Sequence, residues 1–271
     1  MAFALSDRAQ AAGYRLAAFR TIGSTSQEAV GRARDGDPGP LWVVAEHQSA
    51  GQGRRGSAWH TPRGNLAASL LLTTDLSPAT LATLGFAAGV ALAKALDACA
   101  REDMASFKAR TPFRLKWPND VLVDGAKLAG ILLGTEELGG GRRAVVLGIG
   151  VNVAAAPEGL PYPATSLHAL GCATDAERLF TALSASWLEV EGVWDGGRGF
   201  AEIREAWLAR AAGLGGAVAV RTGGDARRGT FETIDGQGQL VLRSPDGAIH
   251  RVSAGEVHFG AAASATPEAR V

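Results

Sequence analysis

The chain has 271 residues, of which 27 are Lys or Arg and 27 are Asp or Glu, so its formal charge at pH 7 is zero. An apolar share of 46% and a charged share of 20% predict one large folded domain, or one large and one small, and exclude a disordered polyelectrolyte. The neutral balance also argues against binding of nucleic acid through bulk charge, which needs excess cations to displace counterions. The basic residues are unevenly divided, because only four are Lys and 23 are Arg.

In chain order, the apolar patterning predicts strands and helices that do not alternate strictly, which favours an α+β fold. Ser24 begins one helix, since Ser24 and Gln27 have the spacing of a capping box. Ser77 and Pro78 begin another, so the long uncharged segment that they open is predicted to be a buried helix and not a membrane span. Strands are expected at residues 14–19, 41–45, 67–73, 114–117, 121–123, 128–133 and 143–153, and helices at 77–99, 175–193 and 200–211.

The residue pattern changes at about residue 213, where short apolar segments typical of strands alternate with turns such as Gly223-Gly224. Strands at this spacing predict a small β-barrel. We therefore expect a mixed β-sheet domain packed with helices over residues 1–212, a small β-barrel over 213–260 and a loose tail over 261–271.

The two cysteines, Cys99 and Cys172, lie far apart in the sequence, and neither belongs to a Cys-x-x-Cys pair. This excludes a disulfide framework and a thiolate zinc site, and it fits a reducing cytoplasm. Asp7 and Arg8 interrupt the N-terminus before the apolar run of a signal peptide can form. The sequence has no nucleophile elbow and no metal-ligand spacing of histidines, which argues against a triad hydrolase and a zinc enzyme.

Residues 51–56 read Gly-Gln-Gly-Arg-Arg-Gly and match the pattern of a dinucleotide-binding loop. That fold needs a helix directly after the glycines, whereas Pro62 and Gly64 follow too soon for one. Ser57 also stands where a P-loop requires Lys. The remaining interpretation is a flexible loop whose backbone N–H and guanidinium groups wrap an anion, and the alternative is a solvated basic turn.

Residues 116–120 read Lys-Trp-Pro-Asn-Asp and place a cation, an amide and a carboxylate at a strand end, because Pro118 prevents continued ladder bonding. This set suits a phosphate with Mg²⁺, and the alternative is an Asx turn capped by Asn119. Asp124-Gly125 between two apolar runs predicts a hairpin, and Lys127 begins its return strand. In a chain that uses Arg almost everywhere, a retained Lys indicates a need for a compact charge, although a lysine that protects an edge strand is the alternative.

Two further segments carry small or polar residues where a ligand can approach. Gly148 and Gly150 lie within an apolar strand, which marks close approach of the backbone to a ligand or, equally, tight packing against a helix. Ser24, Thr25 and Ser26 cap a helix, and a cap also offers spare hydroxyl groups and N–H donors to a polar ligand.

Taken together and in order, these segments resemble the biotin–protein ligase family. The resemblance extends over about positions 14 to 260 and rests on Ser24-Thr25-Ser26, residues 45–56 (AEHQSAGQGRRG), 116–120 (KWPND), 127–130 (KLAG) and 148–152 (GIGVN). It implies an ATP-dependent, AMP-forming enzyme that converts biotin and MgATP to biotinyl-5′-AMP and pyrophosphate. The biotinyl group then passes to a lysine of a biotin carboxyl carrier protein. The resemblance also implies that the C-terminal barrel is SH3-like.

The resemblance assigns a role to each matching residue. Arg54 and Lys127 are expected to be catalytic, with Lys127 on the biotin carboxylate and the α-phosphate oxygens, and Asp120 is expected to bind Mg²⁺. The residues expected to bind biotin or its adenylate are Ser24, Thr25, Ser26, Gln48, Gln52, Gly53, Arg54, Lys127 and Gly130. Those expected to bind the nucleotide are Arg55, Lys116, Asn119, Asp120, Gly148 and Asn152.

The sequence departs from the family at Gln52, which replaces the first Arg of the common Gly-Arg-Gly-Arg loop. Gln keeps hydrogen bonding but loses a charge, so weaker retention of the adenylate is expected. Some relatives carry an N-terminal winged-helix domain that represses transcription, and the 23 residues before Ser24 are too few for one, so no DNA binding is expected. A lipoate–protein ligase and a non-catalytic sensor of biotin or its adenylate remain as alternatives, and a homodimer is left open.

Overall fold

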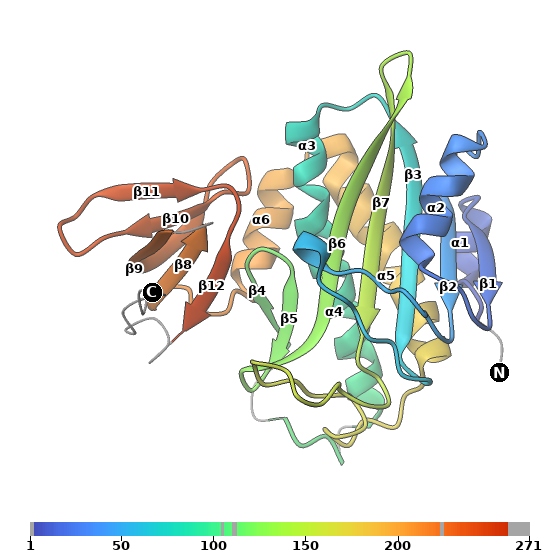
Figure 1. Cartoon of the computed structure of the whole chain (residues 1–271), viewed down its shortest axis with the longest axis horizontal. Coiled ribbons are helices and arrows are strands. Elements are labelled where there is room, and N and C mark those ends of the chain that lie inside the picture. Colours follow the sequence, from blue (N-terminus) through green and yellow to red (C-terminus); the bar gives the residue numbers. More distant parts are fainter. Residues whose placement is uncertain (1–2, 104–105, 110–112, 223–224, 260–271) are drawn as a thin grey trace, which may run out of the picture.

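The computed structural model describes residues 3–103, 106–109, 113–222 and 225–259. Its central sheet contains the strands β1 (Arg15–Phe19), β2 (Leu41–Ala45), β3 (Leu66–Thr74), β4 (Arg114–Lys116), β5 (Asp120–Val123), β6 (Ala126–Gly139) and β7 (Arg142–Val151). These seven strands are ordered β1-β2-β3-β7-β6-β5-β4. β1 and β2 are parallel and the remaining neighbours are antiparallel. A mixed sheet packed with helices confirms the α+β prediction (Figure 1).

Helices lie on both faces of the central sheet (Figure 1). They are α1 (Asp7–Ala11), α2 (Thr25–Arg34), α3 (Pro78–Ala82), α4 (Leu84–Glu102), α5 (Ala176–Trp194) and α6 (Phe200–Leu208), with 3₁₀ turns at Arg54–Gly56 and Asp195–Gly197. α4 and α5 pack against each other and against β6 and β3 on one face. α2 packs on the other face, against β2, β3 and β7, and the part of that face beside α2, called the open face, lines a cavity. The short helix α1 was not expected from the sequence.

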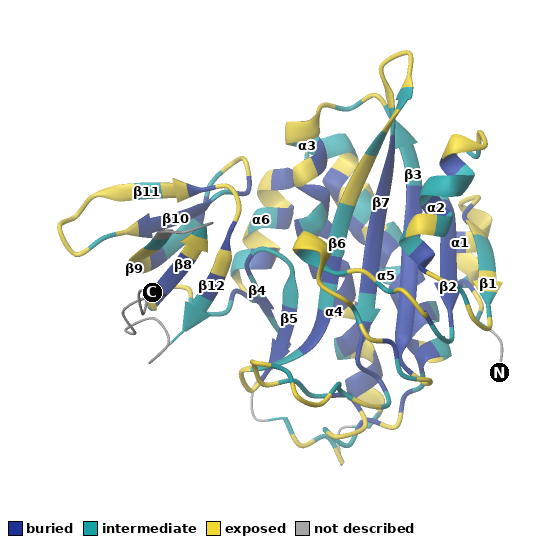
Figure 2. Ribbon diagram, in the orientation of Figure 1, coloured by how far each residue is buried: buried dark blue, intermediate teal, exposed yellow. Residues whose placement is uncertain are grey.

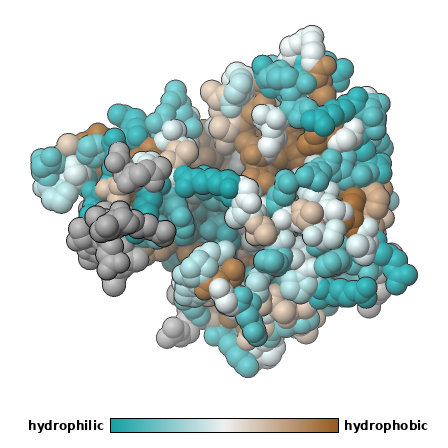
Figure 3. Space-filling view, viewed as in Figure 1, coloured by the Kyte–Doolittle hydropathy of each residue, from teal (hydrophilic) through white to brown (hydrophobic). Residues whose placement is uncertain are grey.

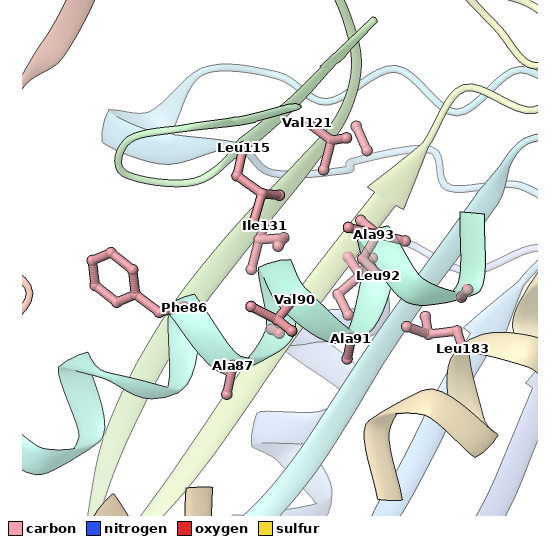
Figure 4. Packing of buried hydrophobic residues seen from close by; sticks show 14 of the residues in the cluster. Phe86, Ala87, Val90, Ala91, Leu92, Ala93, Leu115, Val121, Ile131 and Leu183 are labelled. Carbon is pink, nitrogen blue, oxygen red and sulfur yellow. The ribbon is translucent and has the colours of Figure 1, made fainter. Parts of the chain in front are cut away.

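The buried helix predicted after Ser77 is confirmed, with the difference that a single turn residue, Thr83, separates α3 from α4. The segment Pro78–Glu102 is apolar and long enough to cross a membrane, but 72% of its most apolar window is buried inside the protein. Figure 4 shows side chains of α4 packed between Ile131 of the sheet and Leu183 of α5. Burial of this kind stabilises a fold by about 1.5–3 kcal/mol for each large aliphatic side chain.

A second sheet follows α6. Its strands are β8 (Ala217–Thr222), β9 (Asp225–Ile234), β10 (Leu240–Arg243), β11 (Ile249–Val252) and β12 (Glu256–Phe259). All pairs are antiparallel and the order is β11-β10-β9-β8-β12. This sheet is the small C-terminal β unit expected from the sequence, although the pairs formed by the described residues leave it open between β11 and β12. The expected turn at Gly223-Gly224 and the tail over 261–271 lie outside the described residues.

Polar contacts join the second sheet to the first. Trp117, at the end of β4, is buried and its Nε1 donates to the carbonyl oxygen of Gly238 at 3.1 Å. Arg204 of α6 donates from Nη2 to Thr233 Oγ1 at 2.9 Å. Figure 2 shows buried residues in β8, β10 and β12 of the second sheet and in β4 and β5 of the central sheet, and β12 lies beside the β4–β5 hairpin (Figure 1). The open face of the central sheet therefore has the second sheet as a neighbour.

Candidate active site

A cavity of about 1080 Å³ lies between the open face of the central sheet, the loop at residues 51–56 and the second sheet. This volume is slightly above the usual range for small-molecule sites, which is about 300–1,000 Å³. From the side of Figure 1, hydrophobic residues gather on the exposed part of the central sheet and hydrophilic residues border them (Figure 3). The sequence-predicted residues that line the cavity are Ser24, Thr25, Ser26, Gln48, Gln52, Gly53, Arg54, Arg55, Lys116, Asn119, Asp120, Lys127, Gly130 and Gly148.

The floor of the cavity is a row of small residues in register across three strands. Ala67 of β3 pairs with Gly150 of β7, which pairs with Gly130 of β6. The indole of Trp59 lies directly against this row, since a Cβ at Gly150 would be only 2.3 Å from a ring atom of Trp59. The absence of a side chain at these glycines thus lets the indole of Trp59, a residue of the protein itself, lie against the sheet. Sequence reasoning missed Trp59, whose one signal was an aromatic residue just after a glycine-rich loop.

One end of the cavity carries hydroxyl and amide groups. Ser24 caps α2 and accepts a hydrogen bond from the Gln27 N–H at 3.4 Å. Gln48 Oε1 accepts from the Thr25 N–H at 2.8 Å and from the Thr25 hydroxyl at 3.0 Å, which fixes the amide at the entrance to the helix. A further hydroxyl, on Ser69 of β3, lies behind them and was also missed, although a serine within the apolar run of β3 was a signal that could have found it.

An ion pair lies beside the small residues of the floor, since a Cβ at Gly130 would be 3.5 Å from Lys127 Nζ. The turn at Asp124-Gly125 has positive φ at both residues, 49° and 82°, as the sequence predicted for a tight hairpin. This hairpin brings Lys127 Nζ to 2.7 Å from Asp120 Oδ1, with side chains that are only 18% and 16% exposed. The ammonium group is also 5.6 Å from the ring centroid of Trp59, within cation–π range.

The opposite end of the cavity is cationic. Burial lowers the pKa of Lys116, against the opposing effects of Asp120 and Glu256, and the ammonium group lies 5.7 Å from the ring centroid of Phe259. Burial also lowers the pKa of Arg54, and neighbouring positive charge on Arg55 acts in the same direction. Positive charge held in a partly dehydrated wall interacts strongly with a bound anion.

Arg54 connects the glycine-rich loop to both sheets. Its Nη1 donates to Asn119 Oδ1 at 3.3 Å and to the carbonyl oxygen of Gly255 at 3.2 Å. The second sheet also lines the cavity with side chains that sequence reasoning did not single out. These are Arg221, Glu256, His258 and Phe259.

Asn152 is the one sequence-predicted site residue that the structure does not bring into the cavity. It is 2% exposed, its Nδ2 donates to the carbonyl oxygen of Thr165 at 3.1 Å, and its Oδ1 accepts from Asn65 Nδ2 at 3.5 Å. These bonds tie the chain after β7 to the loop before β3. Asn152 therefore supports the glycine-containing strand from behind.

Comparisons with known proteins agree with this arrangement. A model of the Biotin/lipoate A/B protein ligase family matches residues 20–152, and a model of the Biotin protein ligase C terminal domain matches residues 213–260. The biotin–[acetyl-CoA-carboxylase] ligase of Paracoccus denitrificans is 41% identical over 244 residues, which are 88% of this chain and 97% of that protein. The chain belongs to the biotin protein ligase family.

Further members support the assignment. The biotin–[acetyl-CoA-carboxylase] ligase of Mycobacterium tuberculosis (strain ATCC 25618 / H37Rv) is 37% identical over 87% of this chain and 85% of that protein. The biotin protein ligase of Aquifex aeolicus, solved in complex with biotin and ATP, has a TM-score of 0.72 at 24% identity. The match covers 90% of this chain and 97% of the Aquifex aeolicus chain. That structural similarity shows that the described part of this chain has the fold of a biotin protein ligase.

Proposed function

We propose that this protein activates biotin with MgATP to biotinyl-5′-AMP and pyrophosphate and then transfers the biotinyl group to a lysine of a biotin carboxyl carrier protein. The observation that carries the proposal is one cavity in which a hydroxyl- and amide-lined end meets a cationic end at the Lys127–Asp120 ion pair. Such a cavity suits a ligand that is polar and uncharged at one end and anionic at the other. Relatives at 41% and 37% identity bear the name of this ligase, which supports the proposal.

The binding roles follow from the position of each group in the cavity. Ser24, Thr25, Ser26 and Gln48 bind the ureido ring of biotin, above the small residues of the floor. Lys127 binds the carboxylate of biotin, and the cationic end binds the phosphates of ATP. The residues proposed for that end are Arg54, Arg55, Lys116, Asn119 and Asp120.

The first step is attack of the biotin carboxylate on the α-phosphorus. A bond forms between a carboxylate oxygen and phosphorus, and the bond to the bridging oxygen of the β-phosphate breaks, so pyrophosphate leaves. Two anions repel each other as they approach, and charge grows on the α-phosphoryl oxygens in the transition state. Lys127, which lies at the junction of the two ends, stabilises that charge without any protein nucleophile.

The residues present fit a Mg²⁺ ion that is bound together with ATP. Among the residues that the structure describes, no group of three or more His, Cys, Asp or Glu side chains forms a metal site. Mg²⁺ in nucleotide sites is usually held by one or two carboxylates plus the phosphates, and Asp120 would supply such a carboxylate. Bound there, the ion would neutralise phosphate charge.

The second step is attack of a carrier lysine on the carbonyl carbon of the adenylate, with AMP as the leaving group. Until then the mixed anhydride must be protected from water. The loop at residues 51–56, held by Arg54 to Asn119 and Gly255, covers the cavity and performs this role.

We also propose that the chain divides into a domain at residues 1–212 and a second at 213–260. We further propose a cytoplasmic location, which two unpaired and buried cysteines support.

The test is ATP–pyrophosphate exchange with biotin and with lipoate side by side, followed by the mass of a biotin carrier domain after incubation with the protein. We expect exchange that depends on biotin and a mass increase of one biotinyl group on the carrier. Exchange that depends on lipoate would instead make the protein a lipoate ligase. Binding of biotin without exchange would make it a sensor.

A further inference from the structure

A buried hydroxyl group lies directly behind the polar end of the cavity. Ser69 is in the middle of β3, its side chain is fully buried at 0% exposure, and the sequence neighbours Ala68 and Leu70 are apolar. A hydroxyl in such a place destabilises the fold unless it is hydrogen-bonded. Its Oγ lies 2.8 Å from Thr25 Oγ1 and 3.0 Å from Ser26 Oγ, at the first turn of α2.

One backbone group fixes the direction of these hydrogen bonds. The N–H of Thr25 can only donate, so the Gln48 atom 2.8 Å away must be the amide oxygen and not the amide nitrogen. The Thr25 hydroxyl lies 3.0 Å from the same oxygen, and because an amide oxygen carries no proton, the hydroxyl must donate to it.

The remaining directions follow from proton count, because each hydroxyl group has a single proton. Thr25 uses its proton on Gln48, so Ser69 must donate to Thr25 at the 2.8 Å contact. Ser69 has then used its proton, so Ser26 must donate to Ser69 at the 3.0 Å contact. Ser26 also lines the cavity, where it has only lone pairs left to offer.

We propose that Ser69 is a positioning residue that makes the Ser26 hydroxyl a hydrogen-bond acceptor toward the ligand. The inference rests on the proposed function, and the ligand group that it selects is an N–H donor, as in the ureido ring of biotin. A ring with an oxygen atom at the same place would face the lone pairs of Ser26 and would be rejected. A site whose hydrogen-bonding groups have a fixed direction discriminates in this way between ligands of equal shape.

Two neighbours keep the arrangement rigid. A Cβ at Gly148 would lie 2.8 Å from Ser26 Oγ, so the missing side chain there makes room for the hydroxyl group. At the other end of the hydrogen-bonded chain, Gln48 Nε2 donates to Thr61 Oγ1 at 3.1 Å, which holds the amide in its orientation. The direction of the hydrogen bonds from Ser26 to Gln48 is therefore set by fixed groups of the protein and not by the ligand.

The test is Ser69→Ala, which frees the proton of Ser26. Exchange kinetics are measured with biotin and with the two carbamate analogues in which oxygen replaces one or the other ureido N–H. We expect the wild type to favour biotin over at least one analogue by about tenfold or more in kcat/KM. In the variant that preference falls roughly fivefold, because Ser26 can then donate to the ring oxygen. The KM for biotin rises, whereas kcat and the KM for ATP change little.

The matched control is Ser184→Ala, at a serine that is also 0% exposed but lies on α5 away from the cavity. Its Oγ accepts from the Ser6 N–H at 2.9 Å and donates to the Thr181 carbonyl at 2.8 Å, so the variant loses stability without changing the preference between ligands. If Ser69→Ala does not fold, Ser69→Cys gives the same test, because a thiol sulfur is a weak acceptor and leaves the proton of Ser26 largely free.

The outcomes separate the two proposals. A wild-type preference for biotin that persists unchanged in the Ser69 variants overturns the inference and leaves the proposed function intact. A wild type that shows no exchange with biotin overturns the proposed function, and the inference falls with it. A loss of preference in Ser184→Ala equal to that in Ser69→Ala would show a general effect of stability, and would also overturn the inference.

Discussion

Replacement of Lys127 by Met removes the charge at the junction of the two cavity ends and keeps an unbranched side chain. The Nζ–Oδ1 distance to Asp120 is 2.7 Å and both side chains are mostly buried. At an effective dielectric constant of about 20, two unit charges at this distance attract each other by roughly 6 kcal/mol. Desolvation of both groups offsets most of that attraction, so Lys127→Met is expected to lower the free energy of unfolding by about 1–3 kcal/mol.

The effect on adenylation is expected to be larger. Loss of one preorganised group that stabilises transition-state charge lowers kcat by about 10²–10³, or roughly 2.7–4 kcal/mol. The assay is biotin-dependent ATP–pyrophosphate exchange, with urea denaturation of the same samples to measure stability. The variant should stay folded under assay conditions and still exchange at least about a hundredfold more slowly.

A matched control for this prediction is Lys94→Met. Lys94 Nζ also lies 2.7 Å from a carboxylate, that of Glu189, but the two side chains are 45% and 40% exposed. A surface pair of this kind contributes about 1 kcal/mol or less, and it is remote from the cavity, so exchange should be unchanged. A Lys127→Met variant that exchanges at the wild-type rate, or one whose loss is fully explained by unfolding, would refute the reasoning.

Three further variants test other parts of the site. Gly150→Ala puts a Cβ 2.3 Å from the Trp59 ring, so the indole must leave the floor, and we expect the KM for biotin in steady-state exchange to rise about tenfold. Burial lowers the pKa of Lys116 below the ordinary 10.5, so kcat/KM for ATP should fall as pH rises through that lowered value, and a pH profile of Lys116→Arg should lack the decline. Arg54→Ala removes both bonds that hold the loop, and chromatography should detect faster release of biotinyl-5′-AMP, by about tenfold.

Local features of the structure could be predicted well from the sequence. The start of α2 at Ser24, the hairpin turn at Asp124-Gly125 and the buried helix after Ser77 each depend on residues that are neighbours in the chain. The motifs that resemble the ligase family were also local, and the structure brings nearly all of their residues to one cavity. Their individual roles stay predictions.

Features that depend on pairing between distant strands could not be predicted. Ser69 and Gly148 become neighbours only because β3 pairs with β7, and no pattern within either strand specifies that register. Trp59 lies in the loop before β3, and its contact with Gly150 of β7 also joins segments that are far apart in the sequence. Asn152 was expected to bind the nucleotide because residues 148–152 resemble the ligase family, whereas its partners come from loops at residues 65 and 165.

The second sheet supplies its part of the cavity wall from residues that are synthesised after those of the central sheet. The hydroxyl end is built from residues 24–69, which are synthesised early, whereas Gly255 and Phe259 are synthesised after most of the cavity lining. A nascent chain thus contains every residue of the hydroxyl end before it has the carbonyl group of Gly255 that anchors Arg54. An interrupted translation product would lack the closed compartment in which a reactive adenylate is kept from water.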